Sequence, residues 1–318
     1  MRLKKLLFSL LGIPLFVYLI SIVGVDTIVP VLYNIDLGLL ALALAITPIT
    51  LLLKGFKWQY IMKLHGFNYP LLSATRVWTV GMFLGIITPA RVGDFMKVFY
   101  LKKVEKSTGK CLSSIVIDRF LDLITSLLFA GLGLLWVSWF FETADYLVFL
   151  GLLVLSFFAI VFISTKKDLA RFVFGPIYRL FVPDKYKKTM KEGFNEFYKS
   201  INDLLRMKRE LLFSLVFSVA IWLLSIFQLQ LLAFAMGIKL AYFYVLIFMS
   251  IAVLVELLPI SIMGLGTREA TLIFLFSLVG LGESQAIAFS IAHLVYAYLL
   301  VATIGFVFWL KEPPEIKL

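Results

Sequence analysis

Cysteine, histidine and charged residues are all scarce in this sequence. The 318 residues include one cysteine, Cys111, and two histidines. One cysteine excludes an intramolecular disulfide, and so few cysteines and histidines exclude the usual zinc-binding clusters. Charged residues make up 15% of the chain, whereas soluble domains carry about 25%. The composition therefore argues against a water-soluble fold.

The motifs of several enzyme classes are also missing. The sequence has no P-loop, no G-x-S-x-G elbow and no dinucleotide fingerprint. It shows no sign of an ATP-driven pump, and we expect no cofactor, no metal and no enzymatic activity. The net charge of +11 is concentrated in a few loops, which favours contact with anionic lipid headgroups over nucleic acid.

Apolar residues dominate what remains. They make up 62% of the chain, and the mean hydropathy is +1.00. A membrane-spanning helix needs about 20 mostly apolar residues. Six segments meet this requirement, at residues 6–28, 37–56, 112–138, 146–164, 211–236 and 285–310. We therefore predict an all-α integral membrane protein of the cell membrane, with residues 1–318 forming a single polytopic domain.

The first apolar run is expected to stay in the membrane. It follows Arg2, Lys4 and Lys5, and it lacks a small-x-small cleavage site before Asp26. We therefore expect an uncleaved first helix with a cytoplasmic N-terminus.

Residues 71–100 form an apolar stretch that is not typical of a single membrane-spanning helix, because polar and charged residues interrupt it. Lysines flank it on both sides, and loops rich in lysine and arginine stay in the cytoplasm. The flanking lysines are Lys54, Lys57 and Lys63 before it and Lys97, Lys102, Lys103, Lys106 and Lys110 after it. Residues 71–100 are therefore predicted to enter the membrane and return to the same side as a re-entrant helical hairpin.

The second half of the chain predicts the same plan in reverse. Residues 166–210 are dense in lysine, arginine and aromatic residues, which predicts a cytoplasmic amphipathic segment or a simple solvated loop. If the C-terminal tail, with Lys311 and Lys317, is also cytoplasmic, residues 241–281 must be re-entrant from the outer side. Halves 1–140 and 141–318 would then hold three crossings each, which inverts the second half relative to the first. Six transmembrane helices plus two re-entrant hairpins, arranged as inverted repeats, is a recurrent transporter plan.

Each predicted hairpin is broken by a motif that combines helix breakers with an arginine and an acid. The two motifs are T-P-A-R-V-G-D at 88–94 and G-L-G-T-R-E at 264–269, with Pro259 upstream of the second. Helix breaks free backbone N–H groups, and arginine matches the geometry of phosphate oxygens. The predicted substrate-binding residues are Arg91, Gly93, Asp94, Gly264, Gly266, Arg268 and Glu269.

A purely structural role for these charges is a second interpretation. Arg91 would pair with Asp94, and Arg268 with Glu269 or another acid, to hold the loops in place. The two interpretations are compatible, because an acid would hold the arginine until a phosphate displaces it.

Further charges lie within apolar segments. Asp118, Arg119 and Asp122 fall early in the 112–138 helix, too deep to reach water easily, so they should face the bundle interior. We expect them to clamp the first hairpin, with proton or substrate handling as the alternative. Glu256 precedes Pro259 and is predicted to be a hydrogen-bonded carboxyl or a proton carrier.

Three motifs in this order resemble one protein family. T-P-A-R-V-G-D, D-R-F-L-D at 118–122 and G-L-G-T-R-E-A at 264–270 are similar to P-G-R-x-G-E, E-R-x-x-D and G-x-G-x-R-E of the flippase-like membrane domain of lysylphosphatidylglycerol synthases. This sequence departs from them at Ala90, Asp94 and Asp118. The resemblance implies lipid translocation without synthesis, because the aminoacyltransferase domain of the two-domain members does not match here.

Three functions remain open from the sequence. We favour a lipid translocase that moves an anionic phospholipid or a polyprenyl-phosphate-linked glycolipid. The alternatives are an integral-membrane transferase acting on a lipid-linked substrate, and a membrane scaffold for a separate lipid-modifying enzyme.

Overall fold

The computed structural model describes residues 35–86, 88–140, 184–256 and 264–313, together with the isolated positions 26, 33, 155, 169, 171 and 172. For residues 89–92 and 184–191 it describes the backbone alone. The predicted spans at 6–28 and 146–164 therefore fall almost wholly outside the described residues, as does Pro259.

Every element in the described residues is a helix, and four helices are long and apolar enough to cross a membrane. They are α4 (Leu37–Leu64), α7 (Thr108–Phe140), α11 (Lys208–Ala235) and the continuous helix Glu283–Lys311. The last consists of α14 (Glu283–His293), the π-helical segment η2 (Leu294–Leu300) and α15 (Val301–Lys311). Long apolar helices are thereby confirmed at the predicted segments 37–56, 112–138, 211–236 and 285–310, and the first two of them extend beyond the predicted bounds.

Five shorter helices lie between the long ones. They are α5 (Leu71–Ile86), the 3-10 helix η1 (Pro89–Met96) and α6 (Lys97–Leu101) in the first hairpin, and α12 (Tyr242–Glu256) and α13 (Thr267–Ser277) in the second. At about 1.5 Å per residue, α5 and α12 reach about 24 Å and 22 Å. A hydrocarbon core is about 30 Å thick, so neither helix spans it alone.

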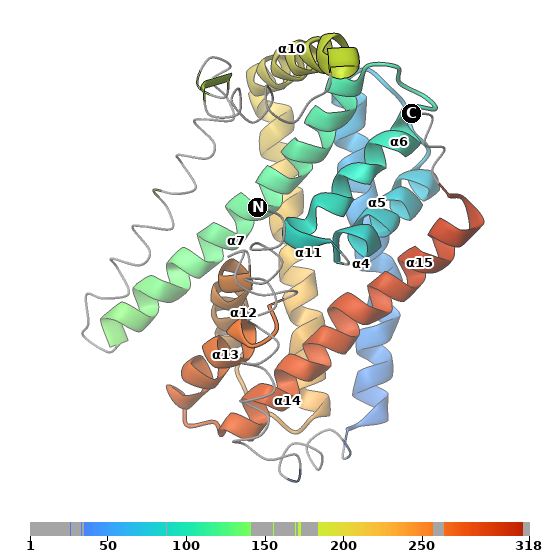
Figure 1. Cartoon of the computed structure of the whole chain (residues 1–318). Helices are drawn as coiled ribbons and strands as arrows, with labels where there is room; N and C mark the ends of the chain where they lie inside the picture. The colour runs from blue at the N-terminus through green and yellow to red at the C-terminus, as the bar shows by residue number, and fades with distance from the viewer. Residues whose placement is uncertain are drawn as a thin grey trace.

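The two hairpins occupy opposite halves of the bundle (Figure 1). The first lies at the end covered by α10 (Asp184–Arg206), and the second lies toward the other end. The order long helix, hairpin, long helix occurs twice, as α4 to α7 and as α11 to α15.

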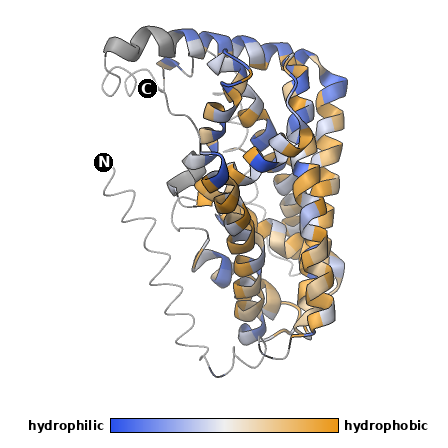
Figure 2. Ribbon diagram, turned by 90° about the vertical axis from the view of Figure 1, so that its right-hand side faces the viewer, coloured by the Kyte–Doolittle hydropathy of each residue, from blue (hydrophilic) through white to orange (hydrophobic). Residues whose placement is uncertain are grey.

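Helix α10 is the polar cap of the bundle. Figure 2 shows hydrophilic colours along it and hydrophobic colours along most of the long helices. Its buried residues Tyr198, Ile201 and Leu204 lie on one face, and α10 packs against α7. Residues 184–206 thus form the amphipathic helix predicted within 166–210.

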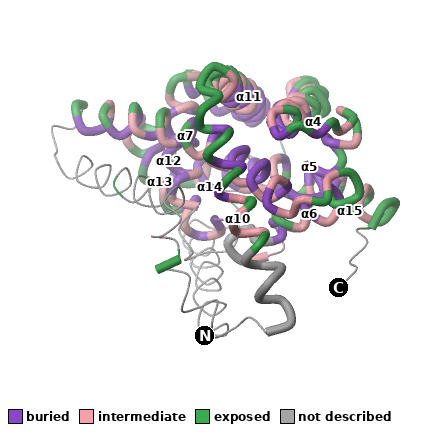
Figure 3. The backbone as a smooth tube through the Cα atoms, turned by 90° about the horizontal axis from the view of Figure 1, so that it is seen from above, coloured by how far each residue is buried: buried purple, intermediate pink, exposed green. Residues whose placement is uncertain are grey.

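The described helices bury one face and expose the other (Figure 3). On α7 the exposed residues include Leu128, Leu132 and Leu135, which follow one another at helical spacing. A stripe of exposed leucines suits contact with lipid chains rather than water.

The assignment of Lys54, Lys57 and Lys97 to cytoplasmic loops is wrong. Helix α4 includes Lys54 and Lys57 and continues to Leu64, and helix α6 begins at Lys97. Lys57 and Lys97 are 2% and 1% exposed. The bundle tolerates these buried cations because carboxylates from other helices pair with them.

Glycines let long helices approach the hairpins closely. A Cβ atom at Gly55 of α4 would lie 2.1 Å from Oγ1 of Thr75 in α5, and one at Gly305 of α15 would lie 2.5 Å from the carbonyl oxygen of Thr79. At Gly133 of α7 it would lie 2.8 Å from Cβ of Ile247 in α12. Small residues at such crossings are the usual means of tight packing between membrane helices.

We predict that Gly55→Ala destabilises the protein by about 1–3 kcal/mol, the usual cost of overpacking. Its thermal unfolding midpoint in detergent should fall below that of the wild type. Gly193→Ala in α10 is the matched control, because a Cβ there meets its nearest neighbour at 3.9 Å. An unchanged midpoint for Gly55→Ala would contradict the tight crossing of α4 and α5.

His65, directly after α4, predicts a pH dependence. Burial, and then the charge of Lys110, lower the pKa of His65 from 6.5 to about 4, and its Nε2 lies 3.0 Å from Oγ of Ser113. The folded state therefore favours the neutral ring, whereas the unfolded chain takes up a proton near pH 6.5. Stability from this residue is complete above pH 6.5 and is lost as the pH falls toward 4. The unfolding midpoint of His65→Gln should decline less over this interval than that of the wild type.

Candidate functional site

Asp94 holds the break of the first hairpin. Asp94 is 2% exposed, its Oδ1 forms an ion pair with Nζ of Lys97 at 2.8 Å, and its Oδ2 accepts from Nε of Arg119 at 2.8 Å. Arg119 lies on α7, so this pair ties the break to a long helix. The contact matches the clamp predicted for the 118–122 motif. A Cβ at Gly81 of α5 would lie 2.6 Å from Oδ1 of Asp94, so the ion pair fits against bare backbone.

Gly93 allows the backbone of the break to pack tightly. Its N–H donates to Oγ1 of Thr88 at 2.7 Å, and the same hydroxyl donates to the carbonyl of Leu84 at 2.8 Å. A Cβ at Gly93 would lie 2.0 Å from that carbonyl oxygen, so a larger residue would force the turn open. The side chain of Arg91 lies outside the described residues, and its predicted pairing and phosphate contact stay predictions.

Asp118 and Asp122 of α7 both bind Lys57 of α4. The Lys57 ammonium lies 2.9 Å from Oδ1 of Asp118 and also contacts Oδ1 of Asp122. It donates to Oγ of Ser218 in α11 at 3.2 Å. A cation buried this deeply needs such partners, because removing either charge leaves the other unpaired in an apolar surrounding. One lysine thus joins three long helices.

Trp78 of α5 connects these ion pairs. Its Nε1 donates to Oδ2 of Asp118 at 3.3 Å. The ammonium of Lys54 lies 4.8 Å from the ring centroid, within the range of a cation–π contact. We call these residues, Lys54, Lys57, Asp94, Lys97, Asp118, Arg119 and Asp122, the first charge cluster.

The second charge cluster, Glu256, Arg268 and Glu269, lies at the break of the second hairpin. The Arg268 guanidinium is 0% exposed and contacts Oε1 of Glu256 at 3.2 Å and Oε1 of Glu269 at 3.0 Å. Its Nε donates to Oγ of Ser290 in α14 at 2.6 Å. The interpretation in which Arg268 pairs with Glu269 or another acid fits these contacts.

Backbone geometry around this cluster depends on its glycines. Gly264 and Gly266 have φ values of +74° and +82°, which side chains with a Cβ rarely adopt. The N–H of Gly266 donates to Oε2 of Glu269 at 2.5 Å, which caps the N-terminus of α13. A Cβ at Gly264 would also lie 2.4 Å from Cγ of Glu256. The G-x-G-x-R-E pattern therefore builds a compact turn around its own ion pairs.

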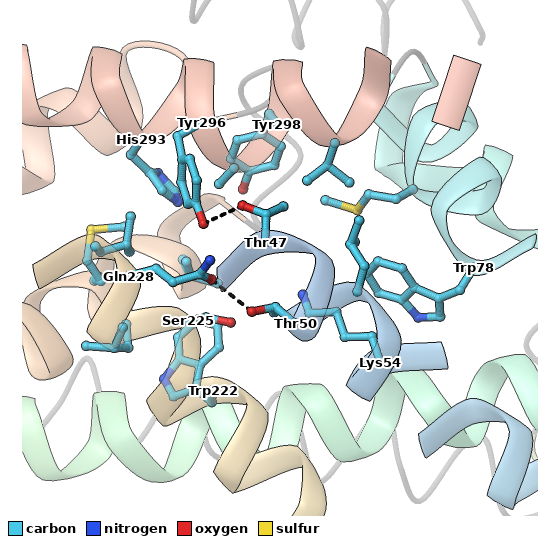
Figure 4. A pocket seen from close by; sticks show the side chains of 18 residues that line it. Thr47, Thr50, Lys54, Trp78, Trp222, Ser225, Gln228, His293, Tyr296 and Tyr298 are labelled. Carbon is cyan, nitrogen blue, oxygen red and sulfur yellow. Dashed lines mark hydrogen bonds between the residues drawn. The ribbon is translucent and has the colours of Figure 1, made fainter. Parts of the chain in front are cut away.

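A cavity of about 170 Å³ lies between the two clusters (Figure 4). Lys54 and Trp78 line it from the first cluster, and Tyr298 lines it beside the second, because its hydroxyl donates to Glu256. Figure 4 shows Tyr296 hydrogen-bonded to Thr47, and Gln228 to Thr50, across this space. Helices α4, α5, α11, α12 and the segment α14 to α15 all contribute to its wall.

The predicted site residues therefore form two separate groups. Asp94, Asp118, Arg119 and Asp122 meet in the first, and Glu256, Arg268, Glu269 and the two glycines meet in the second. None of these side chains is among the described residues that line the cavity. Their role as direct ligands of a substrate remains a prediction, and their contacts hold the two breaks in place.

Sequence reasoning missed the residues of the cavity wall. From the sequence, Lys54 is expected in a loop, and no role is predicted for Trp78, Gln228, Tyr296 or Tyr298. One signal was available, because Lys54 and Lys57 continue an apolar helical run without a break. Lysines so placed need buried partners or a cavity.

Comparison with known proteins identifies the family. The model of the lysylphosphatidylglycerol synthase TM region matches residues 5–305. A UPF0104 membrane protein of Pyrococcus horikoshii is 23% identical, and the alignment covers 97% of each chain. One of Methanocaldococcus jannaschii is 25% identical, with 99% of this chain and 98% of the relative covered. The alignments leave no room in these two relatives for a separate aminoacyltransferase domain. This chain is a membrane protein and belongs to the family of the lysylphosphatidylglycerol synthase transmembrane region.

Proposed function

We propose that this protein is a lipid translocase. The observation that carries the proposal is the cavity of about 170 Å³ inside the bundle, which α5 of the first hairpin and α12 of the second both line, and to which Lys54, Gln228 and Tyr296 contribute polar groups. Ligand sites of transporters built from repeats lie in this position. Membership of the family supports the proposal. The substrate is an anionic phospholipid or a polyprenyl-phosphate-linked glycolipid, and no covalent bond of it changes.

In this proposal both hairpins are re-entrant and the fold is an inverted repeat of six transmembrane helices. In this proposal helix α10 marks the cytoplasmic end, and the C-terminal ends of α4 and α6, next to the exposed Lys63, Lys102 and Lys103, lie at the same end of the bundle. Both termini are proposed to be cytoplasmic. The first hairpin then enters from the cytoplasm and the second from outside. Irregular backbone at membrane depth is tolerated there because protein surrounds it.

The two hairpins act as gates on opposite sides of the cavity. Each moves as a unit, because charges and close glycine contacts fix its break. Opening one hairpin exposes the cavity to one face of the membrane, and opening the other exposes it to the second face. The headgroup crosses through the polar cavity while the lipid chains stay in the surrounding bilayer.

Arg91 and Arg268 have the charge and geometry to bind phosphate oxygens. For Arg268 this requires that a phosphate replace Glu256 or Glu269 as its partner. The full burial of the guanidinium and its contacts with Glu256, Glu269 and Ser290 support a resting state in which Arg268 holds the break in place.

A first prediction concerns a substitution that fills the cavity with a larger side chain. Ala297 lines it, whereas Val295 on the same helix is 52% exposed on the outer surface. Ala297→Phe in proteoliposomes should slow the transbilayer movement of headgroup-labelled phosphatidylglycerol about tenfold, since blocking the path raises the barrier by at least about 1.4 kcal/mol. Val295→Phe, which enlarges a side chain of the same helix on the outer surface instead, should move lipid at the wild-type rate. Equal rates for both variants would contradict transport through this cavity.

A second prediction concerns the hairpin arginines. Arg91→Ala and Arg268→Ala should both lower the transbilayer rate, whereas Arg209→Ala, exposed at the start of α11, should not. Arg268→Ala should also cost about 3 kcal/mol of stability, because two buried carboxylates lose their partner. Unchanged transport in both hairpin variants would argue against the proposal, and turnover of a group donor by protein in detergent would favour a transferase.

A further inference from the structure

The first charge cluster has one more cation than it has acids among its described side chains. Asp94 pairs with Lys97 and Arg119, and Asp118 and Asp122 pair with Lys57. The fourth cation, Lys54, makes no ion pair with any carboxylate in the described part of the chain. It is also the cation that lines the cavity. The excess positive charge of the cluster is therefore presented to the cavity.

Contacts around Trp78 hold the Lys54 ammonium in place without neutralising it. The indole ring lies under Lys54, at 4.8 Å from Nζ to the ring centroid, and donates its own N–H to Asp118. A cation–π contact uses one face of the ammonium and leaves its other donors available. Lys54 is thus prepared to bind an anionic oxygen in the cavity.

Neutral polar groups continue from Lys54 along the cavity wall. Thr50 lies one helical turn before Lys54 on the same face of α4, and its hydroxyl donates to Oε1 of Gln228 at 3.0 Å. Figure 4 shows Lys54, Thr50, Gln228 and the Thr47–Tyr296 pair around the same space. Hydroxyl and amide groups of this kind hydrogen-bond the hydroxyls of a glycerol or a sugar.

Aromatic rings complete the wall. Trp78 and Trp222 line the cavity from α5 and α11, and Tyr296 and Tyr298 line it from η2. Their apolar faces suit the C–H faces of a polyol, and their polar edges are already hydrogen-bonded within the protein. At about 30 Å³ per water molecule, a cavity of about 170 Å³ holds several waters, and so the polar end of a lipid but not its chains.

We propose that the cavity selects a phosphate ester that carries a polyol, with Lys54 bound to the phosphate and the Thr50–Gln228 and Thr47–Tyr296 pairs bound to the hydroxyls. The inference takes from the proposed function only that the ligand is a lipid. A phosphatidylglycerol-like lipid and a polyprenyl-phosphate-linked sugar share this chemistry. An aminoacylated headgroup does not fit, because its ammonium would meet the Lys54 ammonium.

Binding can be measured separately from transport, in detergent, through the change in tryptophan emission, since two of the six tryptophans, Trp78 and Trp222, line the cavity. The probes are dioctanoylphosphatidylglycerol, a short-chain prenyl phosphate carrying a hexose, and the lysyl ester of dioctanoylphosphatidylglycerol. We expect saturable binding of the first, the second or both, and at least about tenfold weaker binding of the lysyl ester, as expected for like charges at close range. Whichever of the first two probes binds more tightly identifies the class of lipid that supplies the phosphate. Failure of both to bind, or equal binding of the lysyl ester, would overturn the proposal.

Variants of α4 assign the effect to Lys54. Lys54→Gln should weaken binding of the preferred probe about tenfold, the usual loss of one charge-assisted contact, while Lys54→Arg stays within about threefold. Lys63→Gln, an exposed lysine of the same helix, controls for net charge and should bind like the wild type. Wild-type affinity in Lys54→Gln would overturn the assignment.

Gln228→Glu tests the site without touching Lys54. It keeps the shape of the side chain but places a carboxylate on the cavity wall, so binding of the anionic probe should again weaken about tenfold. This variant keeps the proposal testable if Lys54→Gln does not fold, and unchanged affinity would overturn the proposal.

Binding without transport in proteoliposomes would refute the proposed function alone. Transport at the wild-type rate in the Lys54 variants would refute the inference alone.

Discussion

The structure depends on one constraint, which is that charges and irregular backbone inside an apolar bundle must find their partners within the protein. Both helix breaks meet this constraint in the same way. Asp94 holds the first break to Arg119 of α7, and Arg268 holds the second to Ser290 of α14. Buried pairs of this kind contribute little net stability, because desolvation offsets most of their attraction. They do, however, strongly disfavour any arrangement in which one partner is left alone, and so they fix where each hairpin ends.

The same constraint explains why polar side chains stand among the apolar residues of the cavity wall. If each hairpin ended in apolar residues, the middle of the bundle would close on itself as an ordinary core. Because each break carries its own cluster of charges, side chains that bridge the clusters are polar too, as Tyr298 is beside Glu256 and Lys54 is beside Trp78. The polar groups of the cavity wall therefore follow from how the hairpins are held, and Lys54 of the first cluster gives that wall a positive charge.

The sequence allowed the described long helices to be predicted, because runs of about 20 apolar residues have few alternatives. It also allowed the breaks to be located, because proline, glycine and charge interrupt those runs visibly. The lysines of α4 were misplaced for a physical reason. The positive-inside rule treats every lysine near a helix end as solvated, whereas Lys57 is held by carboxylates that are 61 and 65 residues away in the sequence. A pairing at that separation depends on how α4 packs against α7, and no local pattern contains it. The cavity wall is hidden for the same reason, since it draws on five parts of the chain.

The proposed transport, in which the two hairpins open in turn, requires two conformations of the protein with similar free energy. Buried ion pairs suit this requirement better than a continuous apolar contact between the hairpins and the long helices does. Separating an apolar interface costs free energy in proportion to its area, whereas an ion pair is lost at little net cost when another charged group takes the place of one partner. A phosphate offers Arg268 the same bidentate geometry as a carboxylate. In the proposed mechanism, a headgroup that enters beside Lys54 would bring such a phosphate into the space between the clusters. The proposed lipid-binding charge and the charges that hold the hairpins would then compete for the same kind of partner, and this competition would link binding of the headgroup to release of a hairpin.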